Sequence, residues 1–374
     1  MNSFIGEKKY DLDTPCLVID KSKLLSNIQL MQEHCKQHNV QLRPHVKTHK
    51  CSEIAQMQIK AGAVGICAAK ISEAEVLAKA NIPGILITSP VVTDYKIKKL
   101  IQILKLRSDL SVVVDNYQNL MDLNNAAKLN NLIISVLIDI DPGIGRTGIK
   151  SDEALFFAAK IKEFKNLNLV GIQCYAGNLQ HITSYAERKK ASLAVMHRAG
   201  LVAKELRTHR LCCDIVTGSG TGTYNIDVKE KEVTEIQPGS YIVMDVEYNA
   251  IDAQVKGQGF KEFSNSLTML TTVISSNNKH HVTADAGWKA LYVNDLRPKI
   301  VSHANLSYDW GGFGDEHGKI TANTPDCVLP KNGEVLEMVV PHCDPTINLF
   351  DRFYIIENDI VVDEWQIDMR GKSQ

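Results

Sequence analysis

The sequence lacks a long apolar run and an excess of charge of one sign. No stretch approaches the roughly 20 apolar residues that a membrane span requires. The start, Met1 to Tyr10, is polar and charged rather than a basic segment followed by an apolar one. The 42 basic side chains nearly balance the 43 acidic ones, and no Lys/Arg run is interleaved with aromatics as in a nucleic-acid groove. We therefore expect a soluble, cytoplasmic protein that binds neither membrane nor nucleic acid.

Paired cysteine motifs are also missing. The nine cysteines are an odd number and form no CxxC pair, which argues against a disulfide framework and against a structural zinc site. We expect reduced thiols.

The length and the hydrophobic content, 374 residues and 44%, suffice for a barrel core and a smaller second domain. Short β-branched runs alternate with longer amphipathic stretches such as 21–38, a pattern typical of βαβ units. Eight runs are strand candidates: 40–44, 63–68, 84–88, 110–115, 133–140, 167–175, 214–217 and 240–245. We predict the α/β class with a (βα)8 TIM-like barrel, and an open doubly wound sheet is the alternative.

The pattern changes after Tyr248. Strand-like runs joined by Gly, Asn, Pro and Asp turns follow, at 267–274, 280–284, 334–340 and 352–357. This predicts three parts: an N-terminal segment 1–20 that joins the β domain, a barrel over 21–248, and a β-rich domain over 249–374.

A basic cluster, Arg43-Pro44-His45-Val46-Lys47-Thr48-His49-Lys50, directly follows the first strand. The carboxyl ends of barrel strands carry the active site. Lys47 can form a Schiff base if its amine is partly neutral, which burial beside the cations Arg43 and His45 would favour. The alternative is a solvated basic loop.

A glycine-rich loop, residues 217–223, follows the seventh strand. It is neither a Walker loop nor a dinucleotide fingerprint, but its amides and hydroxyls suit a phosphate, and a barrel's phosphate site commonly follows strands seven and eight. A flexible turn without a ligand is the alternative. The candidate cofactor-binding residues of this loop are Thr217, Gly220, Thr221 and Gly222.

Two further groups carry chemistry. Gln173, Tyr175 and His181 stand where the sixth strand ends, although each alone is an ordinary packed or exposed residue. In the β-rich part, His342 and Asp344 would point to the same side of an extended segment and can hold a divalent ion with positions left open. Cys343 between them would face away, so we assign it no ligand role. A satisfied turn is the alternative.

Together these motifs resemble, nearly end to end, the D-threonine aldolase and D-serine dehydratase family, PLP (pyridoxal phosphate) enzymes of the alanine-racemase fold. Besides the segments quoted above, the resemblance rests on Asp13-Thr14-Pro15, Gly145-Arg146-Thr147-Gly148, Gly171-Ile172-Gln173-Cys174-Tyr175, Gly314-Asp315-Glu316-His317-Gly318 and Pro341-His342-Cys343-Asp344-Pro345-Thr346. It also implies a homodimer.

The resemblance implies residue roles. Lys47 would carry PLP, Gly220 to Thr223 would hold its phosphate, and Tyr175 would lie near the pyridine nitrogen. Arg146 would brace Lys47 or a cofactor oxygen, and His181 would be the catalytic base. Gln173 and Tyr241 complete the candidate cofactor-binding set.

The family's dehydratases resemble His-x-Cys at the metal position, suited to zinc, and its aldolases His-x-Asp, suited to manganese or magnesium. His342-Cys343-Asp344 therefore indicates a carbon–carbon lyase that uses PLP and Mn²⁺ or Mg²⁺, with Zn²⁺ as the alternative. We expect cleavage of a D-3-hydroxy amino acid, such as D-threonine, to glycine and an aldehyde. A D-serine dehydratase that yields pyruvate and ammonia, a racemase and a non-catalytic PLP-binding protein are the alternatives, and the substrate's side chain stays open.

Overall fold

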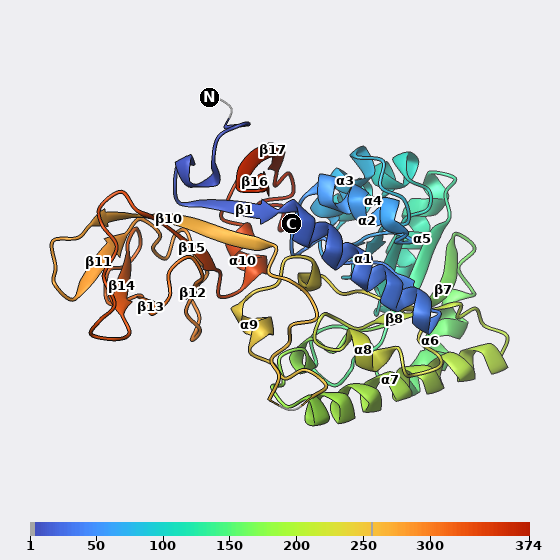
Figure 1. Ribbon diagram of the computed structural model, residues 1–374. Coiled ribbons are helices and arrows are strands. Elements are labelled where there is room, and N and C mark those ends of the chain that lie inside the picture. Colours follow the sequence, from blue (N-terminus) through green and yellow to red (C-terminus); the bar gives the residue numbers. More distant parts are fainter. Residues whose placement is uncertain (1–3, 256) are drawn as a thin grey trace.

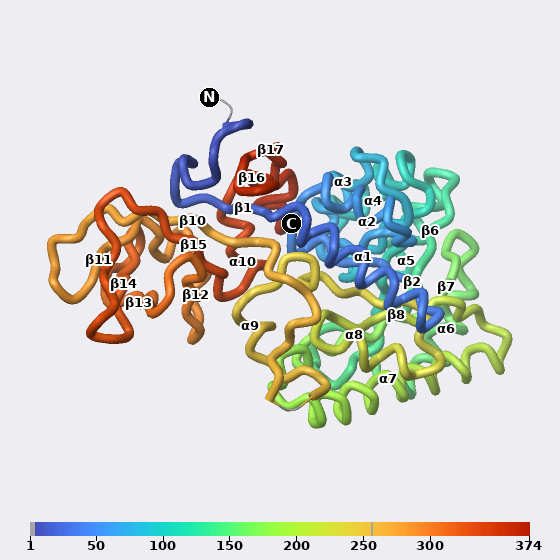
Figure 2. Tube along the Cα trace, in the orientation of Figure 1, coloured from blue at the N-terminus to red at the C-terminus, as the bar shows by residue number. Residues whose placement is uncertain are grey.

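The computed structural model describes residues 4–255 and 257–374, so the predicted N-terminal segment begins with residues 1–3 that lie outside the described chain. Figure 1 shows two parts side by side, a helix-covered parallel sheet and a part made mainly of strands. The same division is visible along the Cα trace in Figure 2. The chain begins beside the strand-rich part, crosses into the helical part at α1, and returns after α9.

The parallel sheet forms the predicted barrel. Its strands are β2 (Gln41–Leu42), β3 (Cys67–Ala68), β4 (Leu86–Ile87), β5 (Ser111–Val114), β6 (Ile134–Asp139), β7 (Leu167–Cys174), β8 (Ile215–Gly218) and β9 (Glu235–Ile236). Their order is β2-β9-β8-β7-β6-β5-β4-β3, and all neighbours are parallel. A parallel bridge between His45 and Cys67 joins the chain after β2 to β3 and closes the ring. The barrel prediction is therefore confirmed, and the open doubly wound sheet is wrong.

One predicted strand is misplaced. The run 240–245 contains the 3-10 helix η4 (Ser240–Ile242), and the eighth barrel strand is β9, just before Pro238. Residues 240–245 are all buried, including the polar Ser240 and Asp245, so their burial shows no periodicity. A short run of that kind does not distinguish a strand from a buried helical turn.

Helices connect the barrel strands and cover the barrel. The long helices are α1 (Lys21–His38), α2 (Ser52–Ala61), α3 (Ile71–Lys79), α4 (Asp94–Leu106), α5 (Tyr117–Leu129), α6 (Ala154–Ile161) and α7 (Tyr185–Thr208). The short helical turns are η1 (Lys9–Asp11), η2 (Ser151–Glu153), η3 (Gly177–Leu179), α8 (Tyr224–Asp227), α9 (Val246–Asn249) and α10 (Cys343–Ile347). No helix in the described ranges has both the length and the apolar character that crossing a membrane requires.

The sequence of α1 explains its limits. The side chain of Asp20 caps its first turn by accepting a hydrogen bond from the Lys23 amide at 3.1 Å. Asn39 ends the helix in the left-handed conformation, with φ 55°. Its buried apolar side chains fall on one stripe, three or four residues apart: Leu24, Ile28, Met31 and Cys35.

The barrel interior has its own small core. Cys67, Leu86, Val113 and Leu137 form a buried cluster separate from the main one. They alternate along β3 to β6 with side chains that belong to the main core, so the two sets point to opposite faces of the strands. The separate cluster therefore fills the barrel.

The second sheet has nine strands drawn from both ends of the chain. They are β1 (Cys16–Asp20), β10 (Leu267–Ser275), β11 (His281–Ala284), β12 (Lys299–Ile300), β13 (Leu306–Asp309), β14 (Gly318–Ala322), β15 (Val335–Val339), β16 (Arg352–Glu357) and β17 (Ile360–Gln366). The main order is β13-β14-β11-β10-β1-β16-β17, and β15 pairs with β10 and β12. β1 is parallel to β16 and antiparallel to β10, so the segment before the barrel lies inside this sheet.

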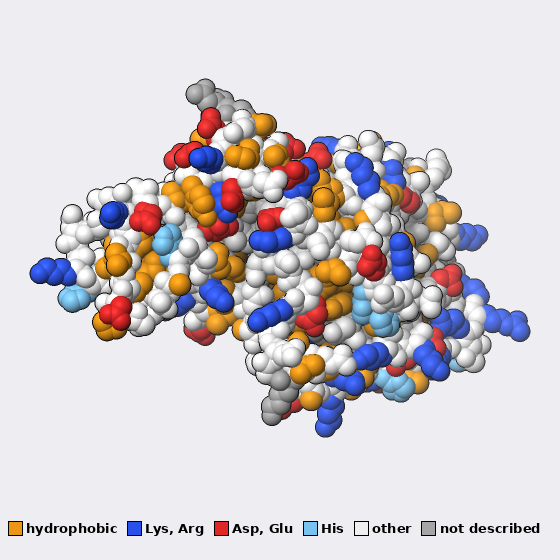
Figure 3. Space-filling model, viewed as in Figure 1, with side chains coloured by type: hydrophobic (Ala, Val, Ile, Leu, Met, Phe, Trp, Pro, Cys, Tyr) orange, Lys and Arg blue, Asp and Glu red, His pale blue; other side chains and the backbone are white. Residues whose placement is uncertain are grey.

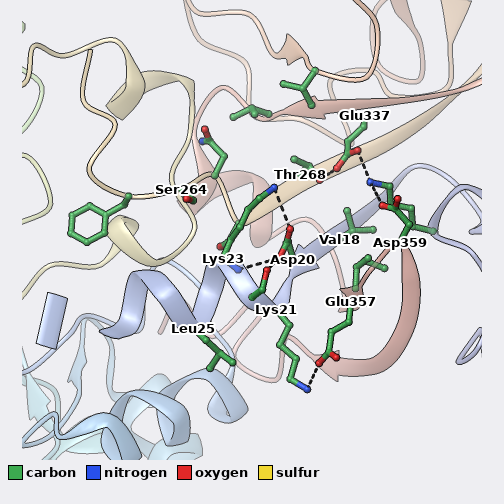
Figure 4. A pocket seen from close by; sticks show the side chains of 18 of the residues that line it. Val18, Asp20, Lys21, Lys23, Leu25, Ser264, Thr268, Glu337, Glu357 and Asp359 are labelled. Carbon is green, nitrogen blue, oxygen red and sulfur yellow. Dashed lines mark hydrogen bonds and ion pairs between the residues drawn. The ribbon is translucent and has the colours of Figure 1, made fainter. Parts of the chain in front are cut away.

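The surface offers no single-sign charged face in the view of Figure 3, where acidic and basic side chains are interspersed. A cavity of about 1010 Å³ lies between the start of α1 and the second sheet (Figure 4). Ion pairs lie along its lining, including Lys21 with Glu357 at 2.6 Å and Lys23 with Asp20 at 3.2 Å. Lys47 does not line this cavity, so it is separate from the site described below.

A buried ion pair stabilises the barrel. Arg43 donates to both carboxylate oxygens of Glu235 and to the Gly84 carbonyl, and both charged side chains are nearly inaccessible. We expect Arg43→Met to reduce the free energy of unfolding by about 3–5 kcal/mol, because it leaves the Glu235 charge buried and unpaired.

Urea unfolding monitored by circular dichroism measures this change. The control is Arg107→Met, which breaks a partly exposed pair with Asp109 and should cost about 0–1 kcal/mol. The double variant Arg43→Met/Glu235→Leu should recover part of the loss. Equal free energies of unfolding for Arg43→Met and Arg107→Met would contradict the stabilising role given to the buried pair.

Candidate active site

Lys47 lies in the turn after β2, where the first barrel strand ends. Its Nζ forms an ion pair with Oδ2 of Asp344, which belongs to α10 of the strand-rich part. Burial alone would lower the pKa of Lys47, but the charge of Asp344 outweighs burial and holds that pKa above its ordinary value. The two parts of the molecule therefore meet at this lysine.

The sequence predicted that the charges of Arg43 and His45 would lower the pKa of Lys47, and this prediction is wrong. The charge of Arg43 is compensated by Glu235 inside the barrel. Burial, followed by the charge of Lys47, holds the pKa of His45 well below its ordinary value, so His45 is a neutral ring rather than a cation. Its Nε2 lies 3.1 Å from Thr88 Oγ1.

His342 is held by two carboxylates. Its Nδ1 lies 2.9 Å from Asp245 Oδ2 and 3.1 Å from Glu247 Oε2. Burial alone would lower the pKa of His342, but the hydrogen bond to Asp245 and the nearby acidic groups raise it. Because Nδ1 donates to carboxylates, Nε2 is the nitrogen left for a metal ion, an arrangement common among metal-binding histidines.

The structure changes the expected geometry around Cys343. Helix α10 begins at Cys343, so the alternation of an extended segment does not apply there. Ligand atoms of Asp245, His342 and Cys343 lie within 4.8 Å of one another, so the thiol does not face away from this group. Burial and the charges of Asp245 and Asp344 hold the pKa of the Cys343 thiol well above its ordinary value.

Asp344 faces the barrel. Besides the contact with Lys47, its Oδ1 accepts a hydrogen bond from Ser240 Oγ at 3.2 Å. Burial would raise the pKa of Asp344, but the charges of Lys47 and His342 hold it below its ordinary value. The Asp344 carboxylate is therefore ionised, and it interacts with the charges of both Lys47 and His342.

His181 lies in the loop between η3 and α7, beside these residues. The centroid of its ring is 4.5 Å from that of Tyr248 and 6.1 Å from that of His342. Burial lowers the pKa of His181, so the ring is neutral near pH 7 and can accept a proton. Its Nδ1 is buried without a hydrogen-bond partner in the described ranges, as expected for a group that contacts a ligand.

The residues at the end of β7 have different partners. Gln173 Nε2 donates to Asp139 Oδ1 at 2.9 Å and to the Thr88 carbonyl at 3.2 Å. Tyr175 is half-buried, and the guanidinium of exposed Arg146 lies 5.6 Å from the centre of its ring. Tyr175 and Arg146 thus lie together, whereas the amide of Gln173 lies within the barrel network.

The loop 217–223 is held tightly by a residue that the sequence did not indicate. Gln180 Oε1 accepts the Gly222 amide at 3.0 Å, and Gln180 Nε2 donates to Thr223 Oγ1 at 3.1 Å. A Cβ at Gly222 would collide with the main-chain oxygen of Gln180, so glycine is required there. Thr217 is buried and accepts a hydrogen bond from Gln237 at 3.0 Å.

Tyr241 is not brought into the site by its side chain. Its hydroxyl accepts a hydrogen bond from Gln58 at 3.0 Å, and its ring packs 5.5 Å from that of Phe263 in the core. Only its main-chain amide approaches the candidate phosphate loop, donating to Thr221 Oγ1 at 2.9 Å.

The sequence did not predict a role for Asp245 or Glu247. Asp245 also accepts the main-chain amide of Cys343 at 2.9 Å, so one carboxylate orients both His342 and the start of α10. The spacing of Asp245 and Glu247, two acidic residues separated by one, was the feature of the sequence that could have indicated them. The assembled donors, an amine, imidazoles and carboxylates at one end of a barrel, fit a carbonyl cofactor together with a divalent ion.

Comparisons with known proteins agree with this geometry. Residues 19–247 match the family of the alanine racemase N-terminal domain, and residues 266–356 match the putative serine dehydratase domain. A D-threonine aldolase of an Arthrobacter species is 36% identical over 370 residues, which cover 99% of this chain and 96% of the relative. A 3-hydroxy-D-aspartate aldolase of Paracoccus denitrificans (strain Pd 1222) is 34% identical over 371 residues, which cover 98% and 95%.

A solved structure extends the comparison. The crystal structure of D-threonine aldolase from Filomicrobium marinum superposes with a TM-score of 0.91 at 33% identity and covers 100% of both chains. The barrel, the strand-rich part and the two domain matches define an enzyme of the alanine-racemase fold, a class that implies PLP as cofactor. More narrowly, the chain belongs to the D-threonine aldolase and D-serine dehydratase family.

The contact between Asp245 and His342 leads to a prediction. If His342 Nε2 binds a divalent ion, Asp245→Asn should weaken that binding about 10–100-fold, because the carboxylate that orients the ring and increases its basicity is lost. Titration calorimetry with Mn²⁺ measures the affinity. Glu247→Gln, which removes the longer and more exposed contact, should have a smaller effect. Wild-type affinity in Asp245→Asn would refute the role given to Asp245.

Proposed function

We propose that the protein cleaves D-3-hydroxy amino acids of the D-threonine type to glycine and an aldehyde, with PLP and a divalent metal ion. The observation that carries the proposal is the meeting of Lys47 with Asp344, beside His342 and His181, at the end of the barrel. The amine that would bind the cofactor thus lies next to the groups that would bind the metal. The aldolase names of relatives at 34–36% identity support the same reaction.

The cofactor would be held from two sides. Lys47 Nζ would bind it covalently, and the loop 217–223 would hold its phosphate through main-chain amides and hydroxyls. Tyr175 and Arg146, which lie together at the end of β7, would contact the ring end. When bound, PLP supplies an electron sink for the pair released at Cα.

The metal would be held by His342 Nε2 and Asp344. These nitrogen and oxygen donors suit Mn²⁺ or Mg²⁺ and also accommodate Zn²⁺. The bound ion supplies a charge that lowers the pKa of the substrate hydroxyl. Asp245 and Glu247 would fix the His342 ring through Nδ1.

The chain's own groups would move the protons. His181 is neutral, half-buried and close to His342, so it is placed to take the proton from the substrate's β-hydroxyl oxygen. Lys47 Nζ, on the barrel side, would be released when the substrate's amine takes its place on the cofactor, and it would then return a proton to Cα after the bond from Cα to Cβ has broken. Tyr248 packs against His181 and limits the positions of its ring.

One observation favours a second candidate, dehydration of D-serine to pyruvate and ammonia. The Cys343 thiol lies within 4.8 Å of the ligand atoms of His342 and Asp245, and a thiolate would suit zinc. Against this, Asp344 offers an oxygen donor suited to Mn²⁺ or Mg²⁺ at the same end of the barrel, and the relatives at 34–36% identity are named aldolases. We therefore place the aldolase first.

The protein is also proposed to act as a homodimer. Tyr292 packs 6.1 Å from His342 between ring centroids and is 39% exposed, and Trp288 close to it in sequence is 45% exposed. Large apolar side chains that remain exposed beside a site mark a surface suited to contact with a second copy. Light scattering of the purified protein determines its mass in solution.

Purified protein with PLP and Mn²⁺ should release glycine and an aldehyde from D-threonine or D-threo-3-hydroxyaspartate. Lys47→Ala should abolish the release, and a chelator should abolish it until Mn²⁺ is restored. The assay scores glycine, aldehyde, pyruvate and ammonia, with D-serine as the third substrate. Pyruvate and ammonia from D-serine without glycine would replace the aldolase by the dehydratase.

The role of Cys343 is tested separately. Under the aldolase proposal, Cys343→Ser keeps aldehyde release with Mn²⁺, whereas Asp344→Asn lowers it about 10–100-fold, because a metal ligand loses its charge. Circular dichroism checks that both variants fold. A larger loss in Cys343→Ser than in Asp344→Asn would show that the thiol is the ligand.

A further inference from the structure

Arg188 is an arginine that is completely buried in the first turn of α7. Its guanidinium donates to four main-chain carbonyls. Nε binds Gly222 at 2.8 Å, Nη2 binds Asp252 at 2.6 Å, and Nη1 binds both Ile182 and Thr183. Within the described ranges, these hydrogen bonds all go to main-chain oxygens, and the guanidinium has no carboxylate partner within 4.0 Å.

The four carbonyls belong to three segments around the site. Ile182 and Thr183 directly follow His181, the candidate base. Gly222 belongs to the candidate phosphate loop. Asp252 follows α9, and the two carboxylates that hold His342 are those of Asp245, which caps the start of α9, and Glu247 within it. Because Asp252 also donates its amide to the Thr183 carbonyl at 2.9 Å, the segments contact one another as well.

Gln180 provides a second link between the same two loops. It precedes His181, its Oε1 accepts the Gly222 amide, and its Nε2 donates to Thr223 Oγ1 and to the Ala176 carbonyl. The position of His181 and the shape of the phosphate loop are thus set by one continuous network. A displacement of either loop would break hydrogen bonds at both.

The chemistry of the side chain explains why arginine is present. An apolar residue would fill the same space without the cost of burying a charge. Only a planar guanidinium presents donors in several fixed directions, whereas a lysine is a flexible point charge. A buried cation surrounded by carbonyls therefore indicates a directional requirement rather than a packing one.

We propose that Arg188 is a positioning residue that holds the His181 loop and the loop 217–223 at a fixed separation. The inference rests on the proposed function, because it takes His181 as the base and the glycine-rich loop as the phosphate site. Arg188 itself is buried beneath both loops and acts through them. It sets the distance between the cofactor's phosphate and the group that takes the substrate's proton.

Two variants and a matched control test the proposal. Arg188→Met removes all four hydrogen bonds, and Arg188→Lys retains the charge with fewer directions. Arg207→Met is the control, because Arg207 lies on the last turn of the same helix, where it binds the Cys213 carbonyl at 3.0 Å and pairs with Glu232. PLP titration by absorbance should show a dissociation constant about tenfold higher in Arg188→Met. Its kcat should fall about a hundredfold while the KM for D-threonine changes much less.

Hydrogen–deuterium exchange of the cofactor-free proteins gives a readout independent of activity. Segments 176–183 and 219–223 should exchange faster in both Arg188 variants, while the rest of the barrel and Arg207→Met match the wild type. If Arg188→Met fails to fold, Arg188→Lys carries the test, with intermediate values expected. Wild-type exchange and PLP affinity in a folded Arg188 variant, or equal losses in Arg207→Met, would overturn the proposal. A wild-type protein that binds PLP but releases no aldehyde would remove the proposed function, while the exchange data still decide the role of Arg188.

Discussion

The ion pair between Lys47 and Asp344 is the contact on which the arrangement of the molecule depends. It joins a turn of the barrel to α10 of the strand-rich part, and each partner shifts the pKa of the other toward the charged form. The Lys47 side chain is 40% exposed and that of Asp344 is 14% exposed, so solvent weakens the pair, but the contact still favours this relative position of the two parts. The charge of the same carboxylate also raises the pKa of His342. If Asp344 binds a divalent ion, as proposed above, that ion and the lysine would compete for one carboxylate.

Three histidines near this pair show how surroundings give one residue type different roles. His45 is enclosed and close to Lys47, so it stays neutral and serves as a hydrogen-bonded part of the barrel end. His181 is also neutral, but its Nδ1 has no hydrogen-bond partner among residues 4–255 and 257–374. His342 contacts two carboxylates, and it is the one of the three whose pKa is raised rather than lowered. The neutral ring of His181 thus lies 6.1 Å, between centroids, from the more basic ring of His342, an arrangement that suits proton transfer.

The sequence was most informative where local chemistry repeats. Seven of the eight predicted barrel strands overlap observed ones because β-branched runs reflect burial on both faces. The run 240–245 failed because it is buried throughout and lacks the alternation that would separate a strand from a helical turn. The role of Lys47 was predicted from its place after a strand and from family resemblance, and it stays a prediction. Asp245, Gln180 and Arg188 were not, because their roles depend on loops that meet only in the folded chain. For the same reason, the sequence suggested cations around Lys47, whereas the fold supplies an anion.

The place of β1 in the second sheet has a consequence for how the chain reaches its native state. β1 is made first, yet its two neighbours, β10 and β16, come from the last third of the sequence. During synthesis the barrel segment can collapse while β1 still has both edges unpaired. Sheet completion therefore waits until β16 has left the ribosome. Pairing across such a long sequence separation is slow, so we expect assembly of this sheet, rather than closure of the barrel, to limit the rate of maturation.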